Sequence, residues 1–263
     1  MASTPDSLSP AEVYDSRFVP ALFGPWGRRV CELADVGPGH QVLDVACGTG
    51  ALALAAAERI GAEGRVVGLD PNPEMLAVAR RKSSRVEWHD GRAEEIPFRD
   101  GSFDRVVSQF GFMFFEDPAR ALRQMARVLR TGGRLVVAVC DALDHSPGYA
   151  VLTELLQRLF GPEPAQAFRA PFALGDRDRL AGIAAAAGLR AEVRRVEGSV
   201  RFDSIEDLVA SERACAWTLG GVLDDEQFAR LSAAAAESLA PFAGADGRVS
   251  FGMPALCVVA EKA

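Results

Sequence analysis

Residues 42–50, with the sequence VLDVACGTG, could bind a small charged ligand. The apolar half predicts a buried strand, and the glycine half predicts a tight turn that opens a helix. Glycine lets the backbone adopt a positive φ and approach a ligand closely, and the N–H groups at a helix start suit a carboxylate. A second predicted strand ends at Asp70, 20 residues after Gly50, where a carboxylate can accept hydrogen bonds from both hydroxyls of a ribose.

Asp44 distinguishes two kinds of nucleoside site. A dinucleotide-binding turn places its first glycine directly after the strand and has a third glycine for close helix packing. Here Asp44 comes four residues before Gly48, and Ala53 takes the position of the third glycine. A carboxylate in an apolar strand end needs a partner, and it suits the positive amino group of a methionine moiety better than a pyrophosphate. The alternatives are a structural role for Asp44 and a nicotinamide dinucleotide as ligand.

Short apolar runs alternate with amphipathic stretches from residue 41 onward, and these elements must position the candidate side chains. The alternation is typical of a parallel sheet covered by helices on both faces. The expected strands are 41–46, 65–69, 86–89, 103–108 and 134–140, and the expected helices are 51–60, 73–81 and 118–130. We expect the turn formed by Thr131, Gly132 and Gly133 to end the last of these helices.

The pattern changes after residue 141. Helical stretches at 149–160 and 176–187 precede a strand at 190–196, and helical stretches at 204–217 and 224–241 precede a final strand at 255–260. We expect the helical pair between the last two strands to lie over the carboxyl edge of the sheet as a lid.

Four motifs occur in order, namely VLDVACGTG, GLDPNPEMLAVAR, GRAEEIPFRDGSFDRVVSQFGFMFF and MARVLRTGGRLVV. With them the chain resembles, from roughly Tyr14 to Cys140, the class I S-adenosylmethionine-dependent methyltransferase superfamily. The resemblance is to the branch that includes the ubiquinone and menaquinone biosynthesis methyltransferases. It implies S-adenosylmethionine as the cofactor, S-adenosylhomocysteine as its product and methyl transfer to a small molecule.

The expected fold class is α/β, a Rossmann-like, seven-stranded, mostly parallel sheet with helices on both faces and a helical lid. Residues 1–40 would form an N-terminal helical cap, and residues 41–141 would form the cofactor-binding core. Residues 142–263 would supply the remainder of the sheet with the inserted lid, so that the chain is a single folded unit.

The resemblance also implies roles for individual residues. Asp44, Gly48 and Gly50 would hold the methionine end of the cofactor, and Asp70 would hold the ribose. The remaining expected cofactor contacts are Pro71 and Met75 beside the adenosine, Gly91, Arg92 and Ala93 near the adenine, Gln109 at the start of the loop nearest the reactive methyl group, Ala46, and Tyr14 as a cover. Core packing is the alternative for Met75 and for Tyr14.

Arg92 departs from the pattern of the family, which commonly has an acidic residue here that accepts a hydrogen bond from the adenine amino group. Arginine has no acceptor atom. Either Asp90 or a backbone carbonyl would accept that bond, and Arg92 would lie along the adenine ring instead.

Residues 108–115, SQFGFMFF, should pass the reactive methyl group. They lack the Asn/Asp-Pro-Pro-aromatic motif with which amino-methylating nucleic-acid enzymes hold an exocyclic amine. An oxygen or carbon acceptor on a small, apolar metabolite is therefore favoured. Phe110 and Phe112 are candidate substrate contacts, with core packing as their alternative, and Phe114 and Phe115 are expected to be core residues.

Methyl transfer from a sulfonium requires mainly an in-line nucleophile in a site shielded from water. Of the three histidines, His40 precedes the first strand on the wrong edge, and His89 is expected to be structural. His145 follows the fifth strand at the catalytic edge, so it is the candidate base and a candidate substrate contact. Asp141 and Asp144 are nearby alternatives. We expect no metal site.

The formal charge of −7 offers no broad basic surface for phosphates, so we expect a small-molecule acceptor and no nucleic acid. No apolar run approaches the ~18 residues of a membrane span, and the N-terminus lacks a signal-peptide pattern, so no membrane partner and a cytoplasmic location are expected. A monomer or homodimer is expected. A cofactor-binding regulator or cyclase without methyl transfer is the second hypothesis, and a nicotinamide-dependent oxidoreductase is the third.

Overall fold

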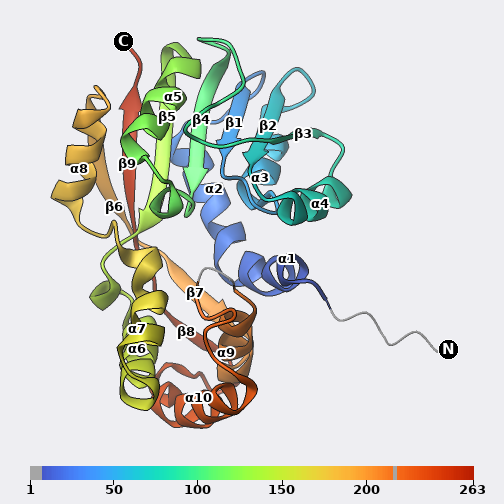
Figure 1. Ribbon diagram of the computed structural model, residues 1–263. Coiled ribbons are helices and arrows are strands. Elements are labelled where there is room, and N and C mark those ends of the chain that lie inside the picture. Colours follow the sequence, from blue (N-terminus) through green and yellow to red (C-terminus); the bar gives the residue numbers. More distant parts are fainter. Residues whose placement is uncertain (1–7, 216–217) are drawn as a thin grey trace.

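A seven-stranded sheet forms the centre of the molecule in the computed structural model, which describes residues 8–215 and 218–263 (Figure 1). The strand order is β3-β2-β1-β4-β5-β9-β6, and β9 runs antiparallel to both of its neighbours in an otherwise parallel sheet. The strands are β1 (Gln41–Val45), β2 (Arg65–Asp70), β3 (Val86–Asp90), β4 (Phe103–Gln109), β5 (Leu129–Cys140), β6 (Ala191–Val196) and β9 (Ala255–Glu261). The expected fold class is confirmed.

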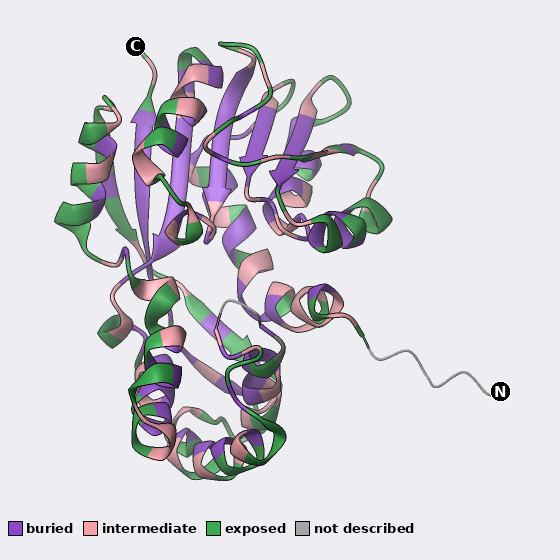
Figure 2. Cartoon of the chain, in the orientation of Figure 1, coloured by how far each residue is buried: buried purple, intermediate pink, exposed green. Residues whose placement is uncertain are grey.

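Helices cover both faces of the sheet, and successive side chains of each strand point to opposite faces. Val42 of β1 packs into one core with α2 (Gly24–Leu33) and α3 (Ala51–Ile60), whereas Leu43 packs into the other with α5 (Pro118–Val128) and α8 (Arg177–Ala186). Helix α4 (Pro73–Lys82) covers β2 and β3. The central strands are accordingly almost entirely buried, and the outer helices are exposed on one side only (Figure 2).

The lid lies beyond the carboxyl ends of the parallel strands (Figure 1). It contains α6 (Pro147–Phe160), α7 (Pro162–Arg169), α9 (Ile205–Ala214), α10 (Asp225–Ser238) and a small antiparallel sheet of β7 (Ser199–Phe202) and β8 (Val249–Gly252). The helix expected at 204–217 ends at Ala214, and the last two residues of that prediction, Ala216 and Trp217, lie outside the described residues. Sequence analysis did not predict α7, β7 or β8, because their apolar patterns are short.

The two strands of the lid continue two strands of the main sheet. Strand β7 follows β6 after a short break, and β8 precedes β9, while the N–H of Met253 donates to the carbonyl of Gly198 at 2.8 Å within the break. A side chain at Gly198 would collide with the ring of Trp26. The lid is therefore joined to the core by a two-stranded ribbon that bends over a fully buried tryptophan.

The N-terminal segment lies between the core and the lid. It consists of α1 (Pro10–Val13), a π-helix labelled η1 (Tyr14–Phe23) and α2. Ser9 caps α1 with a capping box, and Pro20 lies inside the π-helix. Helix η1 contacts α9 and β7 of the lid as well as α3 of the core, so this segment closes the space between them.

Helix α5 and strand β5 meet earlier than the sequence suggested. The helix ends at Val128, and β5 begins at Leu129, so the turn at residues 131–133 lies within the irregular start of the strand. The prediction that α5 extends to residue 130 was wrong, because Leu129 already pairs with Phe103 of β4 before the register shifts.

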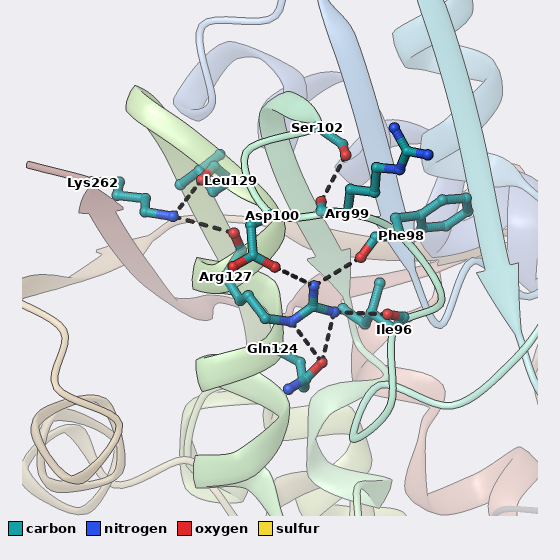
Figure 3. A network of polar contacts seen from close by, with 9 residues as sticks. All are labelled: Ile96, Phe98, Arg99, Asp100, Ser102, Gln124, Arg127, Leu129 and Lys262. Atoms are coloured by element: carbon teal, nitrogen blue, oxygen red, sulfur yellow. Dashed lines mark hydrogen bonds and ion pairs between the residues drawn. The ribbon is translucent and has the colours of Figure 1, made fainter.

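Arg127 fixes the loop between β3 and β4 onto α5 (Figure 3). Its guanidinium donates to the carbonyls of Ile96 and Phe98 and to the carboxylate of Asp100, each at 2.8 Å. The ammonium of Lys262 donates to the carbonyls of Arg127 and Leu129 and so ties the end of the chain to the same place. This network holds a loop whose first residues reach the candidate site.

No helix among the described residues is long and apolar enough to cross a membrane.

Candidate functional site

A cavity of about 730 Å³ lies between the carboxyl edge of the sheet, the N-terminal segment and the lid. It brings together most of the predicted site residues. Those that line it are Tyr14, Ala46, Gly48, Asp70, Pro71, Met75, Gly91, Arg92, Ala93, Gln109 and Phe110. We name its two parts after the roles that the sequence predicts for them: the cofactor end lies at the strand edge, around Asp70 and Gly91, and the acceptor end lies at the lid, around Tyr149 and Phe168.

A small annex of about 20 Å³ adjoins the glycine turn and is lined by Asp44, Thr49 and Gln109. Both carboxylate oxygens of Asp44, the hydroxyl of Thr49 and Oε1 of Gln109 are buried and lack a hydrogen-bond partner in the described part of the chain. Buried polar atoms are normally paired, so these four atoms mark a place where a ligand with hydrogen-bond donors would fit. An ammonium group, which offers three donors, matches this set.

The electrostatics of Asp44 agree with this assignment. Burial raises the pKa of its carboxyl well above the usual range, and the negative charge of Asp70 raises it further. The backbone N–H of Ala53 acts in the opposite direction without reaching the geometry of an ordinary hydrogen bond. A positive ligand group would remove this penalty.

Asp70 connects the ends of two strands. Its Oδ2 accepts a hydrogen bond from the N–H of Gly48 at 2.8 Å, and its Oδ1 accepts one from the N–H of Asn72 at 2.9 Å. Burial raises the pKa of this carboxyl, these two hydrogen bonds lower it, and the charge of Asp90 raises it. Each carboxylate oxygen can accept more than one bond, so Asp70 can still receive the hydroxyls of a ribose from the cavity.

The turn after β1 contains three residues with positive φ, namely Ala46 at 58°, Gly48 at 54° and Gly50 at 88°. Ala46 is a non-glycine residue in this strained region, as is Phe110 at 53°, and both line the cavity. Such strain is often concentrated at functional sites. Gly50 lies outside the cavity lining, because it begins α3 and packs against the ring of Trp88.

Arg92 lies at the rim of the cofactor end. Its guanidinium pairs with Glu116 at 2.9 Å and with Glu94 at 3.6 Å, and the side chain is half exposed. Both acids also line the cavity. Asp90, the candidate acceptor for an adenine amino group, is exposed and is not among the lining residues.

Aromatic residues of the π-helix form one wall. Tyr14 stacks on Phe23 with ring centroids 5.0 Å apart, and Phe18 lies beside both. Gln109 donates to the carbonyl of Phe23 at 2.9 Å and so ties the end of β4 to this wall. Burial raises the pKa of Tyr14 well above its usual value, and the charges of Cys215, Asp70, Asp15 and Asp44 act in the same direction. Its hydroxyl therefore stays protonated over the glycine turn.

The structure corrects two expectations for the segment after β4. Phe112 is fully buried in the core on the α5 face, where it packs edge-on against Phe115, so it does not line the cavity. Phe114, expected to be a core residue, is 41% exposed and lines the cavity, whereas Phe115 packs against the core as expected and also lines the cavity. A short 3-10 helix at Phe112–Phe114 rotates the side chains away from the alternation of an extended strand.

His145 does not line the cavity either. The 3-10 turn Leu143–His145 directs its Nδ1 to within 3.0 Å of the Asp141 carboxylate, which also pairs with Arg195 at 2.9 Å. Asp144 is exposed. The structure therefore does not support His145 as the base or as a substrate contact. His40 and His89 lie outside the cavity lining as well.

The acceptor end contains residues that the sequence analysis did not single out. Glu212 is 2% exposed and accepts a hydrogen bond from Thr218 at 2.8 Å, and the nearby hydroxyl of Tyr149 lowers the pKa of its carboxyl. Phe168 and Phe172 line the same end with Tyr149. The sequence offers one signal for Glu212, namely an acid between apolar positions of a predicted helix. That signal does not reveal which cavity the helix faces.

In the described part of the chain, no group of three or more His, Cys, Asp or Glu side chains is arranged to hold a metal ion.

The sequence has known relatives. Residues 43–137 match a protein-family model described as "Methyltransferase domain". The demethylmenaquinone methyltransferase of Bacillus cereus (strain ATCC 10987 / NRS 248) is 34% identical over 152 residues, which make up 55% of this chain and 64% of that protein. The chain thus matches less than two thirds of the length of this curated relative.

Solved structures share the fold at lower sequence identity. The YcgJ protein of Bacillus subtilis has a TM-score of 0.57 and 21% identity, and the match covers 90% of this chain and 98% of that one. The geranyl diphosphate C-methyltransferase of Streptomyces coelicolor A3(2), solved with Mg²⁺, geranyl diphosphate and S-adenosyl-L-homocysteine, has a TM-score of 0.55 and 14% identity over 92% of this chain and 80% of that one.

Proposed function

We propose that this chain, whose residues 43–137 match a methyltransferase-domain model, transfers a methyl group from S-adenosylmethionine to an oxygen or carbon atom of a small, apolar metabolite. The observation that carries the proposal is the pair of buried carboxylates, Asp44 and Asp70, near the ends of adjacent strands. Asp44 adjoins the small annex and has no hydrogen-bond partner among the described residues, and Asp70 lines the large cavity.

The residues of the cofactor end fit S-adenosylmethionine part by part. Asp44, Thr49 and Gln109 would receive the ammonium group of its methionine moiety, because they offer buried acceptors without partners. Asp70 would accept hydrogen bonds from the ribose hydroxyls. Met75, Gly91 and Ala93 would surround the adenine, and their lack of charge suits a flat, weakly polar ring.

When bound, the cofactor supplies a methyl group that is already activated by the positive sulfur. The remaining tasks belong to the chain. Tyr14, Phe18 and Phe23 cover the strand edge and exclude water. Phe110 packs against Phe23 and lines the same cavity. Methyl transfer of this kind depends chiefly on holding the nucleophile in line and on a dry site.

The walls of the acceptor end support an apolar acceptor. Phe168, Phe172 and Met253 contribute apolar surface, and the volume of about 730 Å³ lies in the range of small-molecule sites. We propose a monomer or homodimer that uses no nucleic acid and acts in the cytoplasm. The cysteines support a reducing compartment, because Cys31, Cys47, Cys140 and Cys257 are buried thiols outside any disulfide bond.

Isothermal titration with S-adenosylmethionine and S-adenosylhomocysteine tests the proposal. We expect micromolar binding by the wild-type protein and about 10- to 100-fold weaker binding by Asp44→Asn, because the neutral amide cannot pair with an ammonium. Asp178→Asn, an exposed change on α8, serves as the matched control and should bind like wild type. The absence of binding by folded wild-type protein would exclude the methyltransferase function.

A further inference from the structure

The acceptor end holds one buried acid, Glu212, in the last turn of α9. Its Oε2 accepts a hydrogen bond from Thr218 Oγ1 at 2.8 Å, and the hydroxyl of Tyr149 lies near enough to lower the pKa of the same carboxyl. All three residues line the cavity that contains Asp70 and Gln109. The hydrogen bond from Thr218 orients the carboxylate without neutralising its charge.

The surroundings of Glu212 offer no compensation for that charge. Among the described residues, the titratable groups whose electrostatics couple to Glu212 are Tyr149 on α6 and Cys140 at the end of β5, and neither is positive. No lysine, arginine or histidine in the described residues forms an ion pair with it. The carboxylate also lies near the carboxyl end of its helix, where the helix dipole disfavours negative charge.

A buried carboxyl group without a counter-charge costs folding free energy. Its position at the wall of a ligand cavity indicates a chemical role, since perturbed acids concentrate at such sites. The rings beside it indicate the kind of ligand. Tyr149 meets Phe168 edge-on at 5.8 Å and Phe172 at a tilt at 6.0 Å between ring centroids, so aromatic side chains line the acceptor end and suit an aromatic ring as partner.

We propose that Glu212 is the general base of the acceptor end and takes the proton from a hydroxyl group of an aromatic acceptor, while Tyr149 and Thr218 position its carboxylate. This inference rests on the methyl transfer proposed above. It deepens that function by naming the acceptor class, a planar phenol, and the residue that activates it.

The step balances as follows for oxygen methylation. The O–H bond of the acceptor breaks, and its proton passes to an oxygen of Glu212. A lone pair of the acceptor oxygen forms the new bond to the methyl carbon of the sulfonium donor, while the S–CH₃ bond breaks and its electron pair stays on sulfur. The products are a methyl ether, a neutral thioether and a protonated Glu212, which then loses its proton to water.

The acidity of Glu212 suits this role. Burial raises its pKa to about 7, and the hydrogen bonds from Thr218 and Tyr149 act against that increase. A general base is most effective when its pKa lies close to the working pH. At neutral pH the group therefore exchanges its proton readily.

The test is a binding measurement that requires no turnover. With S-adenosylhomocysteine saturating, the affinities of 2-naphthol and 2-methoxynaphthalene are compared by calorimetry at about pH 8.5, above the Glu212 pKa of about 7. We expect a preference for 2-naphthol of about 10- to 100-fold, because its hydroxyl donates to a charged acceptor and the methyl ether has no donor. The preference should fall below about threefold in Glu212→Gln.

The controls separate this role from a structural one. Glu206→Gln, an exposed change on the same helix, should keep the full preference. Thr218→Val and Tyr149→Phe each remove a donor to the carboxylate, so the pH midpoint of the preference should move upward, whereas Thr218→Ser should leave it in place. A purely structural role of these side chains would not move that midpoint.

The outcomes are distinguishable from those of the proposed function. Equal preference in wild type and Glu212→Gln, or no binding of 2-naphthol to wild type, would overturn the role of Glu212. Failure to bind S-adenosylhomocysteine, seen in a separate titration, would instead overturn the proposed methyl transfer.

Discussion

The carboxylate of Asp70 at the end of β2 accepts a hydrogen bond from the backbone N–H of Gly48 at 2.8 Å. The same carboxylate accepts another from the N–H of Asn72, so one side chain holds the loops that follow two adjacent strands. A residue that would contact the ligand therefore also shapes the turn beside it.

Replacing Asp70 should separate these two tasks. Asp70→Ala removes both backbone contacts and the ligand contact, so we expect binding of S-adenosylhomocysteine to weaken by about 100-fold and stability to fall by about 1 to 3 kcal/mol. Asp70→Asn keeps one acceptor oxygen and should recover most of the stability but not the affinity. Denaturant unfolding and calorimetry on both variants would check this, and equal stability of Ala and Asn would contradict the structural part.

Asp44 should show affinity and stability moving in opposite directions. The unliganded protein buries its carboxyl without a hydrogen-bond partner among the described residues, so Asp44→Asn should leave the unfolding temperature unchanged or raise it at neutral pH. The same variant should lose most of the stabilisation that saturating S-adenosylhomocysteine gives to wild type. Thermal unfolding with and without ligand measures both effects. A lower unfolding temperature without ligand would indicate a structural role for Asp44.

Glu212 should impose a pH dependence on stability. Its folded pKa of about 7 lies above the ordinary value of 4.5, so its contribution is fully present below about pH 4.5 and is lost as the pH rises through 7. The loss is on the order of 3 kcal/mol. In Glu212→Gln, the free energy of unfolding should change less between about pH 4.5 and pH 7 than it does in wild type. Glu206→Gln should follow wild type. Parallel curves for wild type and Glu212→Gln would contradict the prediction.

Gly50 begins the helix after the glycine turn with a φ of 88°, and a side chain there would overlap Trp88. Gly50→Ala should cost about 1 kcal/mol from left-handed backbone strain. It should cost about 2 kcal/mol or more beyond that, because the turn or the tryptophan must move. Urea unfolding measures the total loss, and a loss of only about 1 kcal/mol would show that Trp88 yields easily.

Arg127 should stabilise the loop that reaches the cavity, although it lies outside the cavity lining. Arg127→Met removes the donors that hold the carbonyls of Ile96 and Phe98 on α5, so we expect a stability loss of about 1 to 3 kcal/mol and faster amide exchange in residues 94–102. Arg127→Lys should recover little, since an ammonium cannot reproduce the planar set of donors. Arg123→Met, an exposed change on the same helix, is the control. Unchanged amide exchange in that loop would refute this coupling.

The core of the fold was predictable because its signals are local. The strands that contain Asp44 and Asp70 are apolar runs with an acid at or next to the last position, and the helix after the glycine turn begins and ends where its flanking glycines lie. Parallel strands then bring both acids to one edge without any further information. The positions of these two residues next to the cavity follow from that geometry, and their contacts with the cofactor stay predictions.

The lid was predicted less completely because its structure depends on distant partners. Strand β7 has four residues and pairs with β8 far along the chain, so neither segment has a strand pattern strong enough to recognise alone. The same dependence hid Glu212, whose helix turns that face toward the cavity only through packing against α10 and the π-helix. His145 was misplaced by a single 3-10 turn, a feature too short for periodicity to reveal.

The ribbon that joins lid and core has a mechanical consequence. The break at Gly198 and Met253 rests on Trp26 of the helix that follows the π-helix. Helix η1, whose aromatic residues line the cofactor end, contacts β7 of the same ribbon. A substitution that loosens the ribbon is therefore expected to disturb the lid and the cover over the cofactor end together.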